Sequence, residues 1–234
     1  MKIDKLVAGY PGRTVLHQVT ADIPDAQLTA VTGPNGSGKS TLLGVLAGVI
    51  RATSGTVERR RRPAFVMQRS EVSDVLPITV RDTVAMGRWA HRGPWRRLSR
   101  RDWSVVDSCL TRLGIADLAG RPLGDLSGGQ RQRALVAQGL AQESDLLLLD
   151  EPATGLDTEA RSHIAAVLKE VTADGVTVVH ATHDLSAALD ADHCLVLRDG
   201  RLLAEGPPDT TPGEIRKKDC AISLSHLRST HGSR

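Results

Sequence analysis

The chain has 234 residues, of which 40% are hydrophobic and only 2% aromatic, and its formal net charge is +3. This length and hydrophobic content suit one α/β domain with an aliphatic core, and the modest charge does not by itself indicate a nucleic-acid-binding protein. No apolar run is long enough to span a bilayer, and residues 1–5 lack the apolar segment of a signal peptide. The cysteines Cys109, Cys194 and Cys220 have neither paired nor metal-type spacing, so we expect free thiols in a reducing compartment.

Short strands are predicted in two stretches near the start of the chain, residues 1–25 and residues 55–67. Residues 1–25 alternate between apolar and polar side chains, which predicts short strands. Their expected apolar positions are Val15, Val19 and Ile23. Residues 55–67 predict a second hairpin, with the arginines 59–62 at its solvated turn.

A phosphate-binding motif lies between these strands. Residues 33–41 match the P-loop pattern at every fixed position, with a predicted buried strand at 28–32 before it and a predicted helix at 40–47 after it. The glycines let backbone N–H groups converge on an anion, Lys39 can reach the β- and γ-phosphates, and the Ser40 hydroxyl can ligate Mg²⁺. The predicted nucleotide-binding residues of this loop are Gly33, Pro34, Asn35, Gly36, Ser37, Gly38, Lys39, Ser40 and Thr41.

Two carboxylates follow a run of four leucines later in the chain. The leucines at 146–149 predict a strand buried on both faces of a parallel sheet. Asp150 and Glu151 then emerge at its C-terminal end, where open α/β sheets bind ligands. We expect Asp150 to hold Mg²⁺ and Glu151 to polarise the attacking water.

Two further segments carry polar groups at the ends of predicted elements. Residues 127–130 read Ser-Gly-Gly-Gln before a predicted helix at 131–141, which is either a second anion-binding device or an ordinary capped helix. A predicted strand at 176–179 leads to His183, which can donate a hydrogen bond to a terminal phosphate. His180 is expected to be a core residue with its hydrogen bonds satisfied.

The remaining organisation follows from local patterns. Helical patterns replace the α/β rhythm from about residue 71 to 125, and the α/β rhythm then resumes. Asp199-Gly200, between two apolar runs, predicts a type I′ hairpin. The end of the chain is polar, and its His226 and His231 are expected to be exposed rather than metal ligands.

In chain order these motifs resemble the ATP-binding subunit of an ABC transporter. The residues and motifs that carry the resemblance are Tyr10, the P-loop, Gln68, Leu126-Ser127-Gly128-Gly129-Gln130, Asp150-Glu151, Asp157 and His183. It covers residues 1–207, with a helical subdomain inserted at about 71–130, and leaves 208–234 as a short polar tail. It implies an α/β fold: a P-loop NTPase core with an antiparallel β subdomain and an inserted helical signature subdomain.

The resemblance also implies a role for each motif. Two cassettes would sandwich two ATP molecules, so that the P-loop of one chain faces the signature of the other. Tyr10 would stack on adenine. Gln68 would sense Mg²⁺ and the attacking water, His183 would clamp the γ-phosphate beside the catalytic Glu151, and Asp157 would order the facing site. The signature residues assigned to the partner's nucleotide are Ser127, Gly128, Gly129 and Gln130.

The chain departs from the family's usual pattern at two places. Thr154-Gly155 stands before Asp157 where Ser-Ala is common, and Gln138-Gly139 stands where Arg-Ala is common. Glycine inside a helix costs about 1 kcal/mol relative to alanine, and the sequence offers no reason for it. No catalytic position is altered, so we expect an active ATPase.

The resemblance also implies partners and a location. It is closest to cassettes of zinc and manganese importers, with iron-siderophore importers second and a non-transport ATPase, such as an iron–sulfur assembly ATPase, as a further alternative. The cassette would lie at the cytoplasmic face of the cell membrane, bound to an integral membrane permease, with an extracytoplasmic binding protein and no nucleic acid. Residues 88–103, rich in arginine and tryptophan, are interpreted as a docking region for the membrane subunit, a solvated loop with a helix starting at Ser99, or a nucleic-acid-binding segment.

Overall fold

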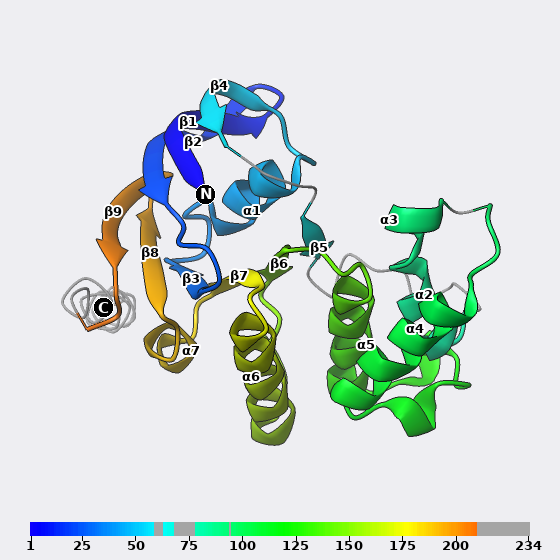
Figure 1. The fold of residues 1–234 in the computed structure, drawn as a ribbon. Coiled ribbons are helices and arrows are strands. Elements are labelled where there is room, and N and C mark those ends of the chain that lie inside the picture. Colours follow the sequence, from blue (N-terminus) through cyan, green and yellow to red (C-terminus); the bar gives the residue numbers. More distant parts are fainter. Residues whose placement is uncertain (59–62, 68–77, 94, 210–234) are drawn as a thin grey trace, which may run out of the picture.

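Two sheets and a group of helices form the described part of the chain, which in this computed structural model comprises residues 1–58, 63–67, 78–93 and 95–209. A three-stranded antiparallel sheet has the order β2-β1-β4, and a six-stranded sheet has the order β5-β6-β7-β3-β8-β9 (Figure 1). The strands are β1 (Lys2–Tyr10), β2 (Arg13–Asp22), β3 (Leu28–Thr32), β4 (Ala52–Val57), β5 (Ala64–Val66), β6 (Leu146–Asp150), β7 (Thr177–Thr182), β8 (His193–Arg198) and β9 (Arg201–Gly206).

The helices cover both faces of the larger sheet. The α-helices are α1 (Lys39–Ala47), α2 (Val80–Met86), α3 (Trp89–Arg92), α4 (Arg100–Arg112), α5 (Gly128–Leu140), α6 (Thr158–Ala173) and α7 (Leu185–Leu189). Two short 3₁₀ turns, Ala116–Leu118 and Leu123–Asp125, lie between α4 and α5. Helix α1 packs in one apolar cluster with the antiparallel sheet, whereas α2, α4, α5 and α6 share the other cluster. Helices α1 and α5 therefore pack in different apolar clusters.

The six-stranded sheet is parallel except at one edge. Strands β5, β6, β7, β3 and β8 pair in parallel, and β9 pairs antiparallel with β8. Strands β3, β6 and β7 are buried at every residue, as the continuous apolar runs predict for strands covered on both faces. The expected hairpin at Asp199-Gly200 is confirmed, because both residues have positive φ, at 49° and 73°, as a type I′ turn requires.

The predicted hairpin at 55–67 is wrong. Strand β4 pairs antiparallel with β1, whereas β5 pairs in parallel with β6 in the other sheet. Ala64 and Val66 are buried and Phe65 is partly buried, which suits a short strand of a covered parallel sheet. The arginines 59–62, expected at the turn, lie outside the described residues.

The apolar face of β2 also differs from the expectation. Val19 and Ile23 are buried as expected, but Leu16 is buried in place of Val15, which is half-buried. The pairing of β1 with β2 shifts register between the pairs of Leu6 and Ala8, and Gln18 has a φ of 51°. Such a bulge moves side chains to the other face of a strand, so a strict alternation fails there.

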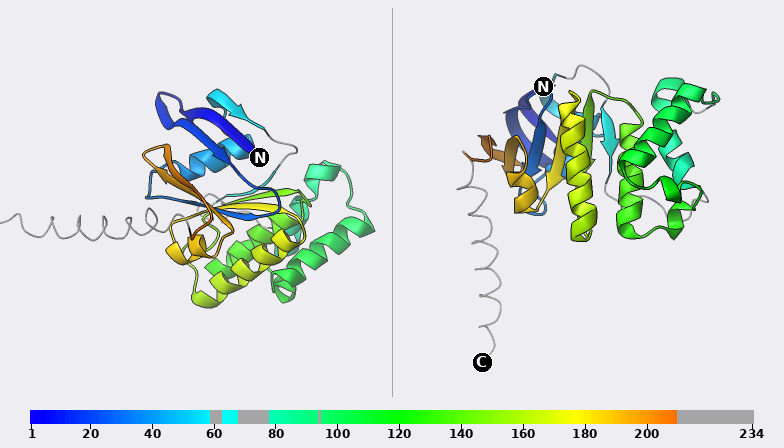
Figure 2. Two further views of the ribbon diagram at one scale, coloured as in Figure 1. Left: turned by 60° about the vertical axis from the view of Figure 1, so that its left-hand side comes forward. Right: turned by 60° about the horizontal axis from the view of Figure 1, so that its bottom comes forward.

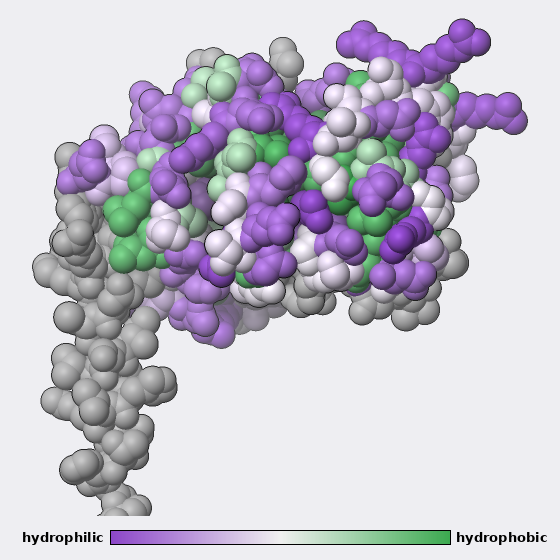
Figure 3. Space-filling model, turned by 90° about the horizontal axis from the view of Figure 1, so that it is seen from below, coloured by the Kyte–Doolittle hydropathy of each residue, from purple (hydrophilic) through white to green (hydrophobic). Residues whose placement is uncertain are grey.

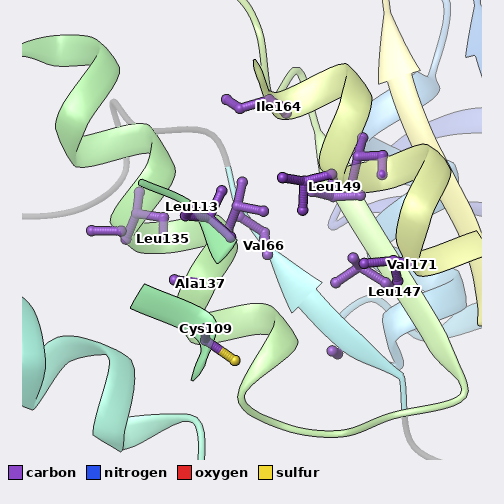
Figure 4. Packing of buried hydrophobic residues seen from close by; sticks show 14 of the residues in the cluster. Val66, Cys109, Leu113, Leu135, Ala137, Leu147, Leu149, Ile164 and Val171 are labelled. Atoms are coloured by element: carbon purple, nitrogen blue, oxygen red, sulfur yellow. The ribbon is translucent and has the colours of Figure 1, made fainter. Parts of the chain in front are cut away.

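The helical segments from α2 to α5 form one side of the molecule, which we call the helical subdomain, residues 78–140 apart from 94 (Figures 1 and 2). Helix α5 begins at Gly128, three residues before the predicted start, because Ser127 caps it. The structure explains why glycine stands at position 139 inside a helix. A Cβ there would lie 2.5 Å from Val66 Cγ2 and 3.2 Å from Leu147 Cδ1, so glycine allows α5 to approach β5 and β6 closely (Figure 4).

Two of the expected free thiols are confirmed. Cys109 and Cys194 are free and buried, and burial raises the pKa of each thiol to about 11. A thiol with so high a pKa stays protonated and unreactive at neutral pH. Cys220, like the rest of the polar tail from residue 210 and with His226 and His231, lies outside the described residues.

Candidate functional site

The glycine-rich loop joins the end of β3 to the start of α1. The first intrahelical hydrogen bond runs from Leu42 N–H to the Gly38 carbonyl at 2.8 Å. The N–H groups of Lys39, Ser40 and Thr41 come before it and have no acceptor among the residues that the structure describes. Gly38 itself has a φ of 102°, a conformation that favours glycine. The loop therefore presents donors at the positive end of a helix, which suits a phosphate group.

Lys39 folds back over the loop. Its Nζ donates to the carbonyls of Gly33 at 3.1 Å and Pro34 at 3.2 Å, and the side chain is 5% exposed. Burial lowers the pKa of Lys39, while the negative charges of Glu151 and Asp150 oppose that shift. The ammonium thus contacts the loop and feels the charge of the two carboxylates, and it can exchange its carbonyl partners for phosphate oxygens.

The loop is held in place by the β8–β9 hairpin, which the sequence analysis did not connect with it. Gly200 N–H donates to the Ser37 carbonyl at 3.1 Å, and its own carbonyl accepts from His17 N–H at 2.8 Å. A Cβ on Gly33 would lie 2.2 Å from the Leu197 carbonyl oxygen. The Asp-Gly pair signalled only a turn, and nothing in the sequence indicated that the turn contacts the loop.

The carboxylates follow β6, as predicted. Asp150 is buried as the last residue of the strand, and Glu151 comes next with a φ of 49°, an uncommon conformation for glutamate. Glu151 Oε2 accepts a hydrogen bond from Thr154 Oγ1 at 2.9 Å and lies 3.4 Å from His183 Nδ1. Thr154 was not predicted to contact Glu151, and the sequence carried no signal for that contact.

Adjacent parallel strands bring these groups together. In the order β6-β7-β3, the strands end at Asp150, at Thr182 just before His183, and at Thr32 just before Gly33. The carboxyl ends of parallel strands meet at one edge of a sheet, which is where open α/β sheets bind ligands. Gln68 lies outside the described residues, so the structure does not place it.

His180 differs from the expectation. It is 5% exposed, as expected for a core residue, but its Nε2 has no hydrogen-bond partner among the described residues. Burial lowers the pKa of His180 to about 4, so the ring is neutral at pH 7. Strand β7, expected at 176–179, continues to Thr182 and contains this histidine.

The signature segment is built as a helix cap. Ser127 Oγ accepts from Gln130 N–H at 3.3 Å, and Gln130 Oε1 accepts from Ser127 N–H at 3.0 Å. Ser127 is exposed, and Gly128 and Gly129 form the first turn of α5. Because α5 packs in a different apolar cluster from α1, the segment is not placed over its own P-loop.

The last two predicted residues lie at the surface. Tyr10, at the end of β1, is 53% exposed. Asp157 is exposed and caps α6, with one carboxylate oxygen accepting from Ala160 N–H at 2.8 Å. Both are free to meet a ligand or a second chain.

The arginine-rich stretch is partly structural. Arg88 is 4% exposed and donates to Asp102 at 3.1 Å, to the Ala141 carbonyl at 2.7 Å and to Glu143 at 2.7 Å. Arg92 also donates to Asp102, at 3.0 Å, and Ser99 caps α4 as expected. Hydrogen bonds from Ser99, and after them the hydrogen bond from Arg88 and the charge of Arg92, hold the pKa of Asp102 well below its usual range, against the opposing effect of burial. The interpretation as a solvated loop is therefore wrong for Arg88.

The described helices include none that is both long enough and apolar enough to cross a membrane. The family model for ABC transporters matches residues 16–154. A probable metal transport system ATP-binding protein of Chlamydia pneumoniae is 37% identical over 88% of this chain and 83% of its own length. The manganese transport system ATP-binding protein MntB of Bacillus subtilis is 31% identical over 100% of this chain and 93% of its own length.

Another relative and two solved structures are also similar. The ferric enterobactin transport ATP-binding protein FepC of Escherichia coli is 37% identical over 88% of this chain and 80% of its own length. The inward-facing structure of a metal-chelate type ABC transporter has a TM-score of 0.80 and 32% identity, covering 88% of this chain and 82% of that chain. A dimeric bacterial ABC transporter cassette has a TM-score of 0.78 and 25% identity, covering 88% and 97%. The chain belongs to the ABC transporter family, and it is a nucleotide-binding ATPase cassette of that family.

Proposed function

We propose that the loop between β3 and α1 binds the phosphates of ATP and that Glu151 is the general base for its hydrolysis. The observation that carries this proposal is the meeting of the loop, the two carboxylates and His183 at the ends of three adjacent strands. Thr154 and the backbone at Glu151 fix the carboxylate, so it can orient a water molecule toward the γ-phosphate. His183, half-exposed beside it, donates to the same phosphate.

Mg²⁺ fits the donor set of this site. The Ser40 hydroxyl and the Asp150 carboxylate are hard oxygen ligands of the kind that Mg²⁺ prefers, and Gln68 is the proposed third ligand. When bound, the ion neutralises charge on the phosphate oxygens. Tyr10 stacks on the adenine base, at the exposed end of β1.

The site is completed by a second copy of the chain. Ser127, Gly128, Gly129 and Gln130 lie apart from the P-loop of their own chain, at the exposed end of a helix whose N–H groups suit a phosphate. In the proposed homodimer they contact the γ-phosphate held by the partner, and Asp157 orders the facing site. ATP then acts as a ligand that stabilises the dimer, and its hydrolysis removes that stabilisation.

The cassette is proposed to drive import through a permease, as a peripheral subunit on the cytoplasmic face of the membrane. Residues 1–207 form the cassette and 208–234 its tail. The relatives named for manganese and metal transport support a divalent transition metal, manganese or zinc, as the cargo. The similarity to FepC supports iron-siderophore import as the second candidate. An extracytoplasmic binding protein completes the proposed system.

The cargo is tested with a strain that lacks this cassette. In metal-depleted medium, the deletion strain should accumulate less manganese or zinc than the parent, and the intact gene should restore uptake whereas the Glu151→Gln gene should not. Normal manganese and zinc uptake with lost siderophore-iron uptake would assign the iron alternative. Normal uptake of all three would refute metal import.

A further inference from the structure

An exposed group of arginines and tryptophans lies at the corner between α3 and α4. We call it the arginine–tryptophan patch, and it lies away from the proposed nucleotide site. Figure 1 shows this corner at the right-hand edge of the molecule, and in Figure 3 hydrophilic side chains project from the same end. The patch consists of Trp89, Trp95, Arg96, Arg97, Arg100 and Arg101, all of them exposed.

Side-chain hydrogen bonds hold this corner in place. Arg92 joins the two sides of the loop, because its guanidinium donates to Ser99 Oγ at 3.1 Å and to Asp102 at 3.0 Å. Ser99 and Asp102 in turn form the capping box of α4. The buried Arg88 anchors the same Asp102 to the end of α5. The loop is therefore held at both ends while its tip projects outward.

The charges on the tip are not paired with any carboxylate in the part of the chain that the structure describes. Arg96, Arg97, Arg100 and Arg101 form no ion pair with any residue in the described ranges. No acidic residue occurs from 88 to 101, and the next carboxylate along the sequence, Asp102, is already bonded to Arg88 and Arg92. Four positive charges thus face outward together, which selects for an anionic partner.

Trp95 gives the patch a second property. It is 96% exposed, more than any other large hydrophobic side chain in the described part of the chain. A side chain exposed to that degree does not line a groove. The aromatic side chains on which single-stranded nucleic acid stacks lie in such a groove. Tryptophan beside arginine is the composition of protein segments at the interface between water and lipid, where the indole lies at headgroup level and arginine meets phosphate.

We infer that the arginine–tryptophan patch binds the anionic phospholipid headgroups of the membrane, with Trp95 inserted at the interface. The inference goes beyond the proposed transport function and takes from it only that the cassette lies next to a bilayer. It assigns direct lipid contact to the cassette itself, in addition to its permease. A deformable headgroup layer accepts a projecting indole and several guanidinium groups at once, without requiring a shaped pocket in the partner.

The test uses the isolated chain without nucleotide and vesicles of phosphatidylcholine, with or without phosphatidylglycerol. We expect co-sedimentation only with the anionic vesicles, weakening as salt rises because headgroup attraction is screened. Each arginine near an anionic surface contributes roughly five-fold in affinity, so Arg96→Gln/Arg97→Gln should bind about 25-fold more weakly. The control Arg13→Gln/Arg51→Gln removes the same charge from two exposed arginines outside the patch and should bind normally.

Fluorescence tests the role of Trp95 separately. The chain has three tryptophans, so the emission shift caused by anionic vesicles should be largely lost in Trp95→Ser. Equal binding by the patch variant and its control, or no preference for phosphatidylglycerol, would overturn the inference. A different result would also overturn it: the parent chain binds a single-stranded oligonucleotide but not vesicles, and the patch variant loses that binding. The patch would then be a nucleic-acid-binding surface. Because the vesicle assay contains no ATP, its failure would leave the proposed ATPase site untouched.

Discussion

The nucleotide-binding core and the helical subdomain present their proposed site residues in opposite ways. In the core, the loop, Asp150 and Glu151 lie at the ends of buried strands and are fixed by internal contacts, such as the Gly200 hydrogen bond to Ser37 and the Thr154 hydrogen bond to Glu151. In the helical subdomain, Ser127 lies exposed at a helix start and is held by its capping box and by the first backbone hydrogen bond of α5. The core thus holds its proposed site residues in a fixed geometry, whereas the helical subdomain presents them on a surface that a partner can approach.

The largest expected effect tests the core half alone. Glu151→Gln should keep nucleotide binding and slow ATP hydrolysis about 10²–10⁴-fold, because the amide keeps an acceptor for Thr154 but loses the general base. Phosphate release and ATP titration measure the two properties separately. The control Glu58→Gln changes an exposed carboxylate at the end of β4 and should be silent. Turnover near normal in Glu151→Gln would mean that another group orients the water.

The next prediction separates the two halves. Ser127→Arg should leave ATP affinity of the single chain unchanged but prevent ATP-dependent dimerisation, with hydrolysis reduced at least about ten-fold through loss of phosphate contacts. Size-exclusion chromatography with ATP measures the dimer. Ser127→Ala removes the cap without bulk, which costs about 1 kcal/mol of stability, and Ser108→Arg adds the same bulk on α4. If Ser127→Arg weakened ATP binding by the monomer, the signature would act within its own chain.

A third change tests how the helical subdomain is held together. Arg88→Met should lower the free energy of unfolding by about 3 kcal/mol, because a buried cation with three hydrogen-bonded partners is removed. Urea denaturation measures the change. Arg100→Met, at an exposed position in the same segment, should stay within about 0.5 kcal/mol of the parent. Equal losses in both variants would contradict the structural role of Arg88.

A smaller change tests the contact between the two regions. Gly139→Ala should destabilise the protein by about 2 kcal/mol, since the added methyl group overlaps Val66 and Leu147 and outweighs the gain in helix propensity. Gly120→Ala adds the same methyl group in open space and should be nearly neutral. Thermal unfolding of the two variants checks the difference, and a stabilised Gly139→Ala would show that α5 and β5 can separate without cost.

The smallest effect comes from the core and depends on pH. The pKa of His180 is about 4 in the folded protein against 6.5 for the free group, so the unfolded chain binds more protons between these values and stability falls as pH decreases through this window. Between pH 7.5 and pH 5.5, the free energy of unfolding should fall by about 1 kcal/mol less in His180→Leu than in the parent, because the variant lacks this titrating group. Urea titrations at both pH values measure it. Parallel pH dependences in parent and variant would show that His180 is not the group responsible.

Much of the core could be predicted because its signals are local. The P-loop pattern, the four leucines before Asp150 and the Asp-Gly turn each specify their own backbone through residue type and spacing, and the structure confirms the strands and the turn. The detailed fold class was implied by the family resemblance that these motifs carry in chain order. The roles proposed for Lys39, Asp150 and Glu151 also began there, since these residues lie next to a predicted strand or helix. Those of Tyr10 and Asp157, in contrast, came from the family resemblance.

The tertiary structure decided what depends on contacts between distant segments. Residues 55–67 looked like a hairpin, yet β4 and β5 join different sheets, because strand partners are chosen by burial and not by proximity in the chain. The arginines of the 88–101 stretch looked alike, but packing buried Arg88 against Asp102 and left Arg96 and Arg97 exposed. No sequence pattern explained the glycine at position 139. The close packing of α5 against β5 and β6 explains it, because a larger side chain would overlap Val66 and Leu147. Spacing encodes local geometry, whereas burial and pairing arise only when the whole chain has packed.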